Sequence, residues 1–314
     1  MYCCDKMLSK FLLIIFKAAM ARLCYALEAD TVVTSLDLSD KDLWSASEGD
    51  MSLLGDALAA NTTIMSLDIS WNKLGSAPEA VMARLCDALA ANTAIKTLDL
   101  GNNKLGTASE AVMAKLCDTL ETNKTIADLN LGGNDLICAS EAAMALLGGA
   151  LAANTDIARL NLADNNLGSS PEKVMKRLCD ALEANTTITA LNLGFNDLGS
   201  VLEPVMERLC NALTANTTIT ALNLGWNDLG SAPEPVMKLL VDALVTNTAI
   251  TQLDLRENEL FEDSEQESFL ELLKIVRMRM QGKDLSLLDK DKPSFYELPL
   301  EILKVILMCM IGAH

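Results

Sequence analysis

The sequence predicts an α/β solenoid, in which strand–turn–helix units stack so that a parallel sheet lies inside and helices lie outside. A frame such as "LNLGWNDLG" occurs eight times, and its first leucine stands at 36, 67, 98, 129, 160, 191, 222 and 253, so every step is 31 residues. An amphipathic helical stretch separates consecutive copies. A fixed period of this length indicates a repeat array whose units bury their apolar faces by stacking on one another.

Each unit should begin with a short strand, because "LDI" at 67–69 alternates apolar and polar residues. Asparagine stands five residues after the leading leucine in seven of the eight repeats, and Lys41 stands there in the first. An asparagine where a strand turns away can bond exposed backbone groups. Stacked in register, these residues predict a hydrogen-bonded ladder that satisfies the turns: Asn72, Asn103, Asn134, Asn165, Asn196, Asn227 and Asn258.

The helix of each unit carries recognisable start and stop patterns. Ser76 and Glu79 form a Ser-x-x-Glu pattern that predicts a capping box, with Pro78 in the first turn. The pattern recurs in the other repeats and fails only at Cys138. Asn92 is expected to end the helix as a left-handed C-cap. One apolar face is predicted from the i, i+3, i+4, i+7 spacing of Met82, Leu85, Cys86 and Leu89.

The repeats predict a solenoid over residues 20–263, flanked by an N-terminal capping helix at 1–19 and C-terminal capping helices at 264–314. Strands repeat about every 4.8 Å whereas helices need about 8–10 Å, so the stack should curve into a horseshoe. The run "FLLIIF" at 11–16 is too short to span a membrane. A first helix that caps the array, a membrane-surface contact, and a mis-assigned start with Met7 or Met20 as the true first residue are the open alternatives. The helix expected at "LPLEILKVIL" near the C-terminus is a cap, a partner-binding element or a membrane contact.

The frame "LxLxxNxLG", followed by an amphipathic helix and "ANTTI", resembles the leucine-rich repeats of the ribonuclease-inhibitor-like type. The nearly uniform "NTTIT-LNL" units are also similar to leucine-rich repeat effectors that intracellular bacterial pathogens deliver into host cells. The resemblance covers roughly residues 20–260. It implies that the concave face binds a protein and that the protein acts in the cytoplasm. If the protein is a translocated effector, that cytoplasm is the host cell's.

Charge and residue types narrow the function. The net charge is −18, with 25 Lys and Arg against 43 Asp and Glu, which argues against nucleic acid and anionic membranes and favours a basic protein partner. The only histidine is His314, which removes the usual nucleophile–histidine pairs, so we predict no enzyme activity and no cofactor.

Nine cysteines do not form a metal or disulfide pattern. Five of them share one helix position, which Gly55, Gly148 and Val241 fill in the other repeats. Such a position is a tight apolar slot, and neighbouring helices are too far apart for a disulfide. We therefore expect free thiols and a reducing compartment. We also expect no metal site and a monomeric protein.

The candidate binding residues are those at which the concave positions differ between repeats. The residues between the strand leucines form an acidic row in the first three repeats, Asp37, Asp68 and Asp99. In-register carboxylates repel one another, so the row indicates a cationic binding partner. Solvation of the carboxylates and hydrogen bonds to the turns are an alternative explanation of the row. Asp128 and Arg159 should pair across adjacent strands, and Arg256 lies at the end of the last one.

The turn position after each strand carries aromatic residues at Trp71, Phe195 and Trp226, with Asp164 and Glu257 in the same column. Phe195 and Trp226 should stand about 5 Å apart, at the strand spacing. Exposed aromatic residues on a rigid scaffold are frequent anchors of interfaces, although rings that brace the stack are an alternative.

The sequence thus favours a non-catalytic module that grips a partner protein on its concave face, as a bacterial effector that inhibits or sequesters an enzyme would. An adaptor that presents a captured protein to ubiquitination through an F-box-like C-terminal helix, and a GTPase-activating protein of the leucine-rich repeat type, are the alternatives.

Overall fold

The computed structural model of the protein describes residues 33–260 and 273–276. Within 33–260 each repeat folds into a three-residue strand, a three-residue 3-10 helix and a thirteen-residue α-helix, and the eighth repeat is described as far as its strand and turn. The strands are β1 (Ser35–Asp37), β2 (Ser66–Asp68), β3 (Thr97–Asp99), β4 (Asp128–Asn130), β5 (Arg159–Asn161), β6 (Ala190–Asn192), β7 (Ala221–Asn223) and β8 (Gln252–Asp254).

The α-helices are α2 (Glu48–Ala60), α3 (Glu79–Ala91), α4 (Glu110–Thr122), α5 (Glu141–Ala153), α6 (Glu172–Ala184), α7 (Glu203–Ala215) and α8 (Glu234–Thr246). The 3-10 helices between strand and helix are η1 (Leu43–Ser45), η2 (Leu74–Ser76), η3 (Leu105–Thr107), η4 (Leu136–Cys138), η5 (Leu167–Ser169), η6 (Leu198–Ser200) and η7 (Leu229–Ser231).

The predicted parallel sheet is confirmed. The eight strands follow one another in chain order, and each leading leucine lies opposite the leading leucine of the next repeat, as Leu67 does opposite Leu98. The strand begins one residue earlier than "LDI" indicates, at Ser66, yet backbone pairing continues beyond it, because the N–H groups of Ile69 and Trp71 donate to carbonyls of the following repeat. The turn residues are therefore held in the same register as the sheet.

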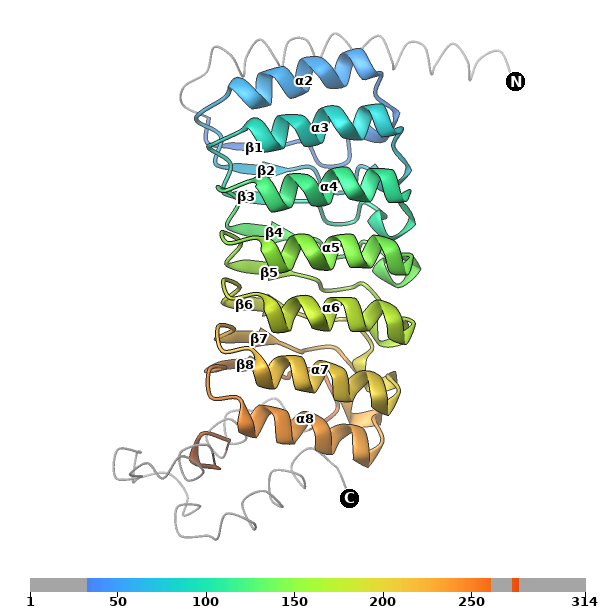
Figure 1. Ribbon diagram of the computed structural model, residues 1–314, viewed down its shortest axis with the longest axis vertical. Helices are drawn as coiled ribbons and strands as arrows, with labels where there is room; N and C mark the ends of the chain where they lie inside the picture. The colour runs from blue at the N-terminus through green and yellow to red at the C-terminus, as the bar shows by residue number, and fades with distance from the viewer. Residues whose placement is uncertain (1–32, 261–272, 277–314) are drawn as a thin grey trace, which may run out of the picture.

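The helices lie together on one side of the sheet and are spread over a greater length than the strands (Figure 1). This difference follows from the wider spacing that packed helices need. The opposite side of the sheet carries no helix within the described ranges, so one face of every strand stays open.

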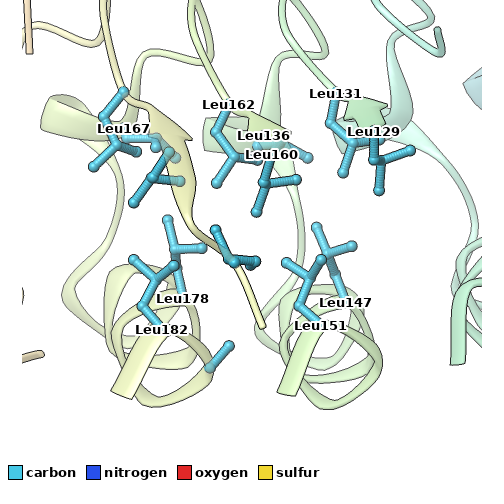
Figure 2. Packing of buried hydrophobic residues seen from close by; sticks show 14 of the residues in the cluster. Leu129, Leu131, Leu136, Leu147, Leu151, Leu160, Leu162, Leu167, Leu178 and Leu182 are labelled. Carbon is cyan, nitrogen blue, oxygen red and sulfur yellow. The ribbon is translucent and has the colours of Figure 1, made fainter. Parts of the chain in front are cut away.

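The core lies between the two layers. Figure 2 shows leucines of β4 and β5 and of the following 3-10 helices facing leucines of α5 and α6, among them Leu129, Leu160, Leu147 and Leu178. These side chains are buried, and each contributes roughly 1.5–3 kcal/mol on leaving water. Residues 273–276 are helical, and Leu273, Ile275 and Val276 join the same core. The rest of the predicted flanks, 1–19 and most of 264–314, lies outside the described residues.

The asparagine ladder is confirmed, and Asn165 illustrates it. Its side chain is fully buried, and its Oδ1 accepts the backbone N–H groups of Asn134 and Leu136 at 3.0 and 3.3 Å. Its Nδ2 donates to the carbonyls of Leu131 and Leu162, both at 3.0 Å. The turn thus has its backbone groups satisfied by a side chain of the next repeat.

The predicted capping box is wrong. Ser76 is the last residue of η2, and its N–H donates to the carbonyl of Lys73 at 2.9 Å, while α3 begins three residues later at Glu79 with Pro78 as its N-cap. The 3-10 turn carries Leu74 into the core, where it is fully buried, and this delays the start of the α-helix. Serine side chains do cap α2, α4 and α5, immediately before the helix, at Ser47, Ser109 and Ser140.

The predicted left-handed C-cap is also wrong. Asn92 has φ −72° and ψ 134°, which is extended backbone. Its Nδ2 donates to the carbonyl of Leu58 in the preceding repeat at 2.7 Å, and its Oδ1 accepts the N–H groups of Ala94 and Ile95 at 2.8 Å. This second buried asparagine column links the ends of successive helices: Asn61, Asn92, Asn123, Asn154, Asn185, Asn216 and Asn247.

Candidate protein-binding face

The open face of the sheet is built by the polar residues that alternate with the buried leucines. In each strand the first and third residues are exposed or half-buried while the middle leucine is in the core. The concave face holds an open hollow of about 650 Å³ that extends over β3 to β8. Its middle is lined by the small side chains of Ala190 and Ala221, between the longer side chains of Arg159 and Gln252 on the neighbouring strands.

The acidic row, Asp37, Asp68 and Asp99, lies on adjacent strands in register. Each carboxylate also accepts the backbone N–H two residues further on, at 2.7 to 2.9 Å. Hydrogen bonds from Ser39 lower the pKa of Asp37 below its usual value. The turn hydrogen bonding that the sequence left as an alternative is thus present, and asparagine makes the same bond in the next strand, where Asn130 accepts from Gly132.

Three cations on or beside the concave face are paired with carboxylates. Arg159 forms the predicted ion pair with Asp128 across the sheet, with one hydrogen bond of 2.7 Å. Arg256 binds Asp254 in its own repeat at 2.6 Å and lowers the pKa of that carboxyl. Lys73 pairs with Asp42 at 3.0 Å. Within the described ranges, no salt bridge neutralises the acidic row.

The three turn aromatics are exposed at the edge of the face. The exposed fractions are 59% for Trp71 and 52% for both Phe195 and Trp226. The rings of Phe195 and Trp226, here called the aromatic stack, lie nearly parallel, with an interplanar angle of 9° and centroids 5.1 Å apart. The predicted adjacency of these two residues is confirmed, and each ring presents one side to its neighbour and the other outward.

The backbone at these aromatic residues is left-handed, with φ of 59° at Trp71, 56° at Phe195 and 58° at Trp226. A residue with a side chain loses roughly 1–2 kcal/mol in this conformation. Gly133 and Asn102 fill the same turn position in other repeats, and both tolerate positive φ better. A turn position that disfavours bulky side chains thus holds a large ring in three of the repeats.

Trp44 provides an internal comparison. This half-buried tryptophan packs against the core, and its indole N–H donates to Asp42 at 3.2 Å. No hydrogen bond from the indole N–H of Trp71 or Trp226 occurs within the residues that the structure describes. Those two donors stay open to a ligand, as is typical of tryptophan at an interface.

The sequence analysis did not single out a second column of exposed or half-buried residues, two positions after the turn aromatics. These residues are also left-handed, and each is the N-cap of the 3-10 helix that follows it. The signal was available in the repeat frame, since the residue after the ladder asparagine varies as much as the turn position: Asp42, Lys73, Lys104, Asp135, Asn166, Asp197, Asp228 and Glu259. Asp197 and Asp228 thus stand beside the aromatic stack.

The helix cysteines are buried free thiols, as predicted, at Cys86, Cys117, Cys179 and Cys210. Burial raises the pKa of Cys86 to about 11 and that of the other three to about 12. In the described part of the chain, no group of three His, Cys, Asp or Glu residues could hold a metal ion. Cys24 lies outside the described residues.

The strand register, the buried leucines and the ladder define this protein as a leucine-rich repeat solenoid, a class of scaffold that generally binds proteins without catalysis. The family described as "Leucine Rich repeat" matches residues 60–77, 184–201 and 215–232. The resemblance drawn from the sequence is therefore confirmed. No curated protein sequence matches the chain significantly.

Among solved structures, the leucine-rich repeat-containing protein LegL7 from Legionella pneumophila is 26% identical, with a TM-score of 0.59, over 77% of this chain and 71% of that one. Actin-binding site 2 of leiomodin-1 is 18% identical, with a TM-score of 0.39, over 51% and 87% of the two chains. The C-terminal domain of Caenorhabditis elegans tropomodulin is 13% identical, with a TM-score of 0.40, over 52% and 92%.

Among the helices at 33–260 and 273–276, none combines the length and the apolar character that crossing a membrane requires.

Proposed function

We propose that this protein is a non-catalytic binding module that grips one partner protein on its concave face, with the aromatic stack as anchor. The observation that carries the proposal is the placement of large, half-exposed rings in the left-handed turns that follow the strands, with residues of β6 and β7, the strands before Phe195 and Trp226, lining the open hollow. Interfaces take most of their binding energy from a few such aromatic residues surrounded by neutral contacts. Trp71 would form a second contact at the N-terminal end of the same edge.

The partner carries a basic surface. The chain has a net charge of −18, and the acidic row has no salt-bridge partner in the described ranges. Complementary charge raises association rates and selects partners more than it raises affinity. The same charge disfavours nucleic acid and anionic lipid, and we expect a monomer that acts in a reducing cytoplasm.

Binding covers a surface of the partner. If the partner is an enzyme, this occlusion would inhibit or sequester it. The similarity of the repeat units to leucine-rich repeat effectors of intracellular bacteria supports a role of this kind in the cytoplasm of a host cell, and LegL7 of Legionella pneumophila is a leucine-rich repeat-containing protein with a similar fold. The adaptor alternative depends on residues 293–314, outside the described ranges, and no described feature favours the GTPase-activator alternative.

The proposal is tested by affinity capture with the full chain, followed by quantitative mass spectrometry. Trp226→Ala should weaken binding of the captured partner by about 2 kcal/mol or more, roughly thirtyfold in Kd. The melting temperature should fall only slightly, because the half-exposed ring gives up little buried area and alanine fits the left-handed backbone no worse than tryptophan does. Phe195→Ala should act in the same direction, and the double variant should be less than additive because the two rings share one contact.

Leu53→Ala is the matched control, since Leu53 is an exposed apolar residue of α2 on the helical side. A partner that Leu53→Ala retains and Trp226→Ala loses supports the concave face. Equal retention by both variants, or a fall in melting temperature with affinity preserved, would show that the stack only braces the turns.

A further inference from the structure

The aromatic stack is bracketed by carboxylates in its own turn column. Phe195 and Trp226 come from consecutive repeats and lie parallel, so their outer faces are turned along the column toward the preceding and following repeats. Those positions hold Asp164 before Phe195 and Glu257 after Trp226, both exposed and both in the same left-handed turn conformation. Carboxylate, ring, ring and carboxylate therefore follow one another at about the strand spacing of 4.8 Å.

Two further carboxylates lie beside the rings. Asp197 and Asp228 each stand two residues after a ring and accept a hydrogen bond from a serine hydroxyl, at 3.0 and 2.9 Å. Across 33–260 and 273–276, no lysine or arginine forms a salt bridge with any of the four carboxylates. The surroundings of Trp71 differ, because Lys73 occupies the equivalent place and is paired with Asp42.

We propose that the aromatic stack and these four carboxylates, Asp164, Asp197, Asp228 and Glu257, bind an arginine side chain from a basic segment of the partner. The proposal rests on the proposed function and specifies what the partner presents to this edge. A guanidinium is planar, so it stacks on an aromatic face, and its N–H fork bonds carboxylates at the same time. Stacked about 3.5–4 Å from a ring, it would reach the carboxylate of the adjacent repeat.

An apolar partner fits this site less well. Covering the rings with an apolar surface would also remove nearby carboxylates from water without a counter-charge, which is costly. A cation can stack on the ring face and neutralise the carboxylates at the same time. A bound metal ion is a poor alternative, because in the described part of the chain the carboxylates do not converge into a metal-binding group.

The test uses the full chain and three fluorescent nine-residue probe peptides of alternating glycine and a variable residue, which is arginine, lysine or citrulline. Binding is followed by fluorescence polarisation at two salt concentrations. The arginine peptide should bind more tightly than the lysine peptide, and the neutral citrulline peptide most weakly. Trp226→Leu keeps an apolar side chain but removes the aromatic face, and should weaken arginine-peptide binding by about three- to thirtyfold, the range of a cation–aromatic contact.

A charge control separates this site from general attraction to an acidic protein. Asp164→Asn with Glu257→Gln should weaken the arginine peptide, whereas Asp56→Asn with Asp87→Asn, at exposed positions of α2 and α3, removes the same charge elsewhere and should change binding little. Circular dichroism melts of each variant establish that it folds.

The proposal is overturned if Trp226→Leu binds the arginine peptide as tightly as the unchanged chain, or if both charge pairs have equal effects. It is also overturned if arginine and citrulline peptides bind alike. If Trp226→Ala loses the captured partner and any of these results is also obtained, the proposed binding face is supported and only the proposal that it binds an arginine side chain is rejected.

Discussion

Replacing Asn165 by alanine tests the ladder on which the repeat depends. Asn165 is fully buried in the middle of the array. Its removal leaves the N–H groups of Asn134 and Leu136 without an acceptor and the carbonyls of Leu131 and Leu162 without a donor. Each buried N–H left unsatisfied costs about 1–3 kcal/mol, so the two together lower the free energy of unfolding by about 2–6 kcal/mol. That is a large part of the 5–15 kcal/mol typical of a domain.

The measurement is urea unfolding followed by far-ultraviolet circular dichroism. Asn161→Ala is the matched control, because Asn161 lies in the same repeat, on the half-exposed concave side, where it bonds Ala163 and Asn130. Water can replace those bonds, so we expect a loss of less than about 1 kcal/mol. If Asn165→Ala costs no more than Asn161→Ala, the buried ladder is not what holds the turns and the reasoning fails.

Two further sets of measurements follow from the acidic row and the buried thiols. Changing Asp37, Asp68 and Asp99 together to asparagine keeps the acceptor for each turn N–H and removes the repulsion between carboxylates. Stability should therefore be equal or higher, while association with the partner slows at low salt. Changing Asp56, Asp87 and Asp118 on the helices to asparagine is the charge-matched control, and equal on-rates for the two triple variants would show that the acidic row is not part of the interface. Among the five cysteines that the structure describes, Cys138 is exposed and should react with a maleimide in the native protein. The other four, Cys86, Cys117, Cys179 and Cys210, should react only after denaturation, and a thiol that needs reductant would contradict the free-thiol assignment. Because burial raises the pKa of these four thiols to about 11 or 12, the stability from keeping them protonated is complete below the unfolded pKa of about 8.5 and is lost as pH rises toward the folded values. The urea midpoint should therefore fall above about pH 9, and Cys179→Ala should make that fall shallower; an unchanged slope would show that other groups cause it.

The turns show how local patterns and packing compete. Ser76 and Glu79 have the spacing of a capping box, yet Leu74 must enter the core, and the 3-10 turn that brings it there moves the helix start to Glu79. Asn92 is a residue that often ends a helix in the left-handed conformation, but a carbonyl of the neighbouring repeat, that of Leu58, draws its side chain inward and leaves the backbone extended. Both errors arise because the spacing of residue types does not specify tertiary packing, neither that of Leu74 in the core nor that of Asn92 against the preceding repeat.

The repetition itself determined the register, the parallel sheet and the buried ladder, because a 31-residue step without insertions places each leucine and each ladder asparagine beside its own copy. It also placed Phe195 beside Trp226, since adjacent repeats are adjacent in space. Only the tertiary structure decided the positive φ of those two residues, the pairing of Arg256 with Asp254 and the absence of salt bridges around the stack in the described ranges. These features depend on side-chain direction and backbone conformation in three dimensions, which residue spacing along a chain does not specify.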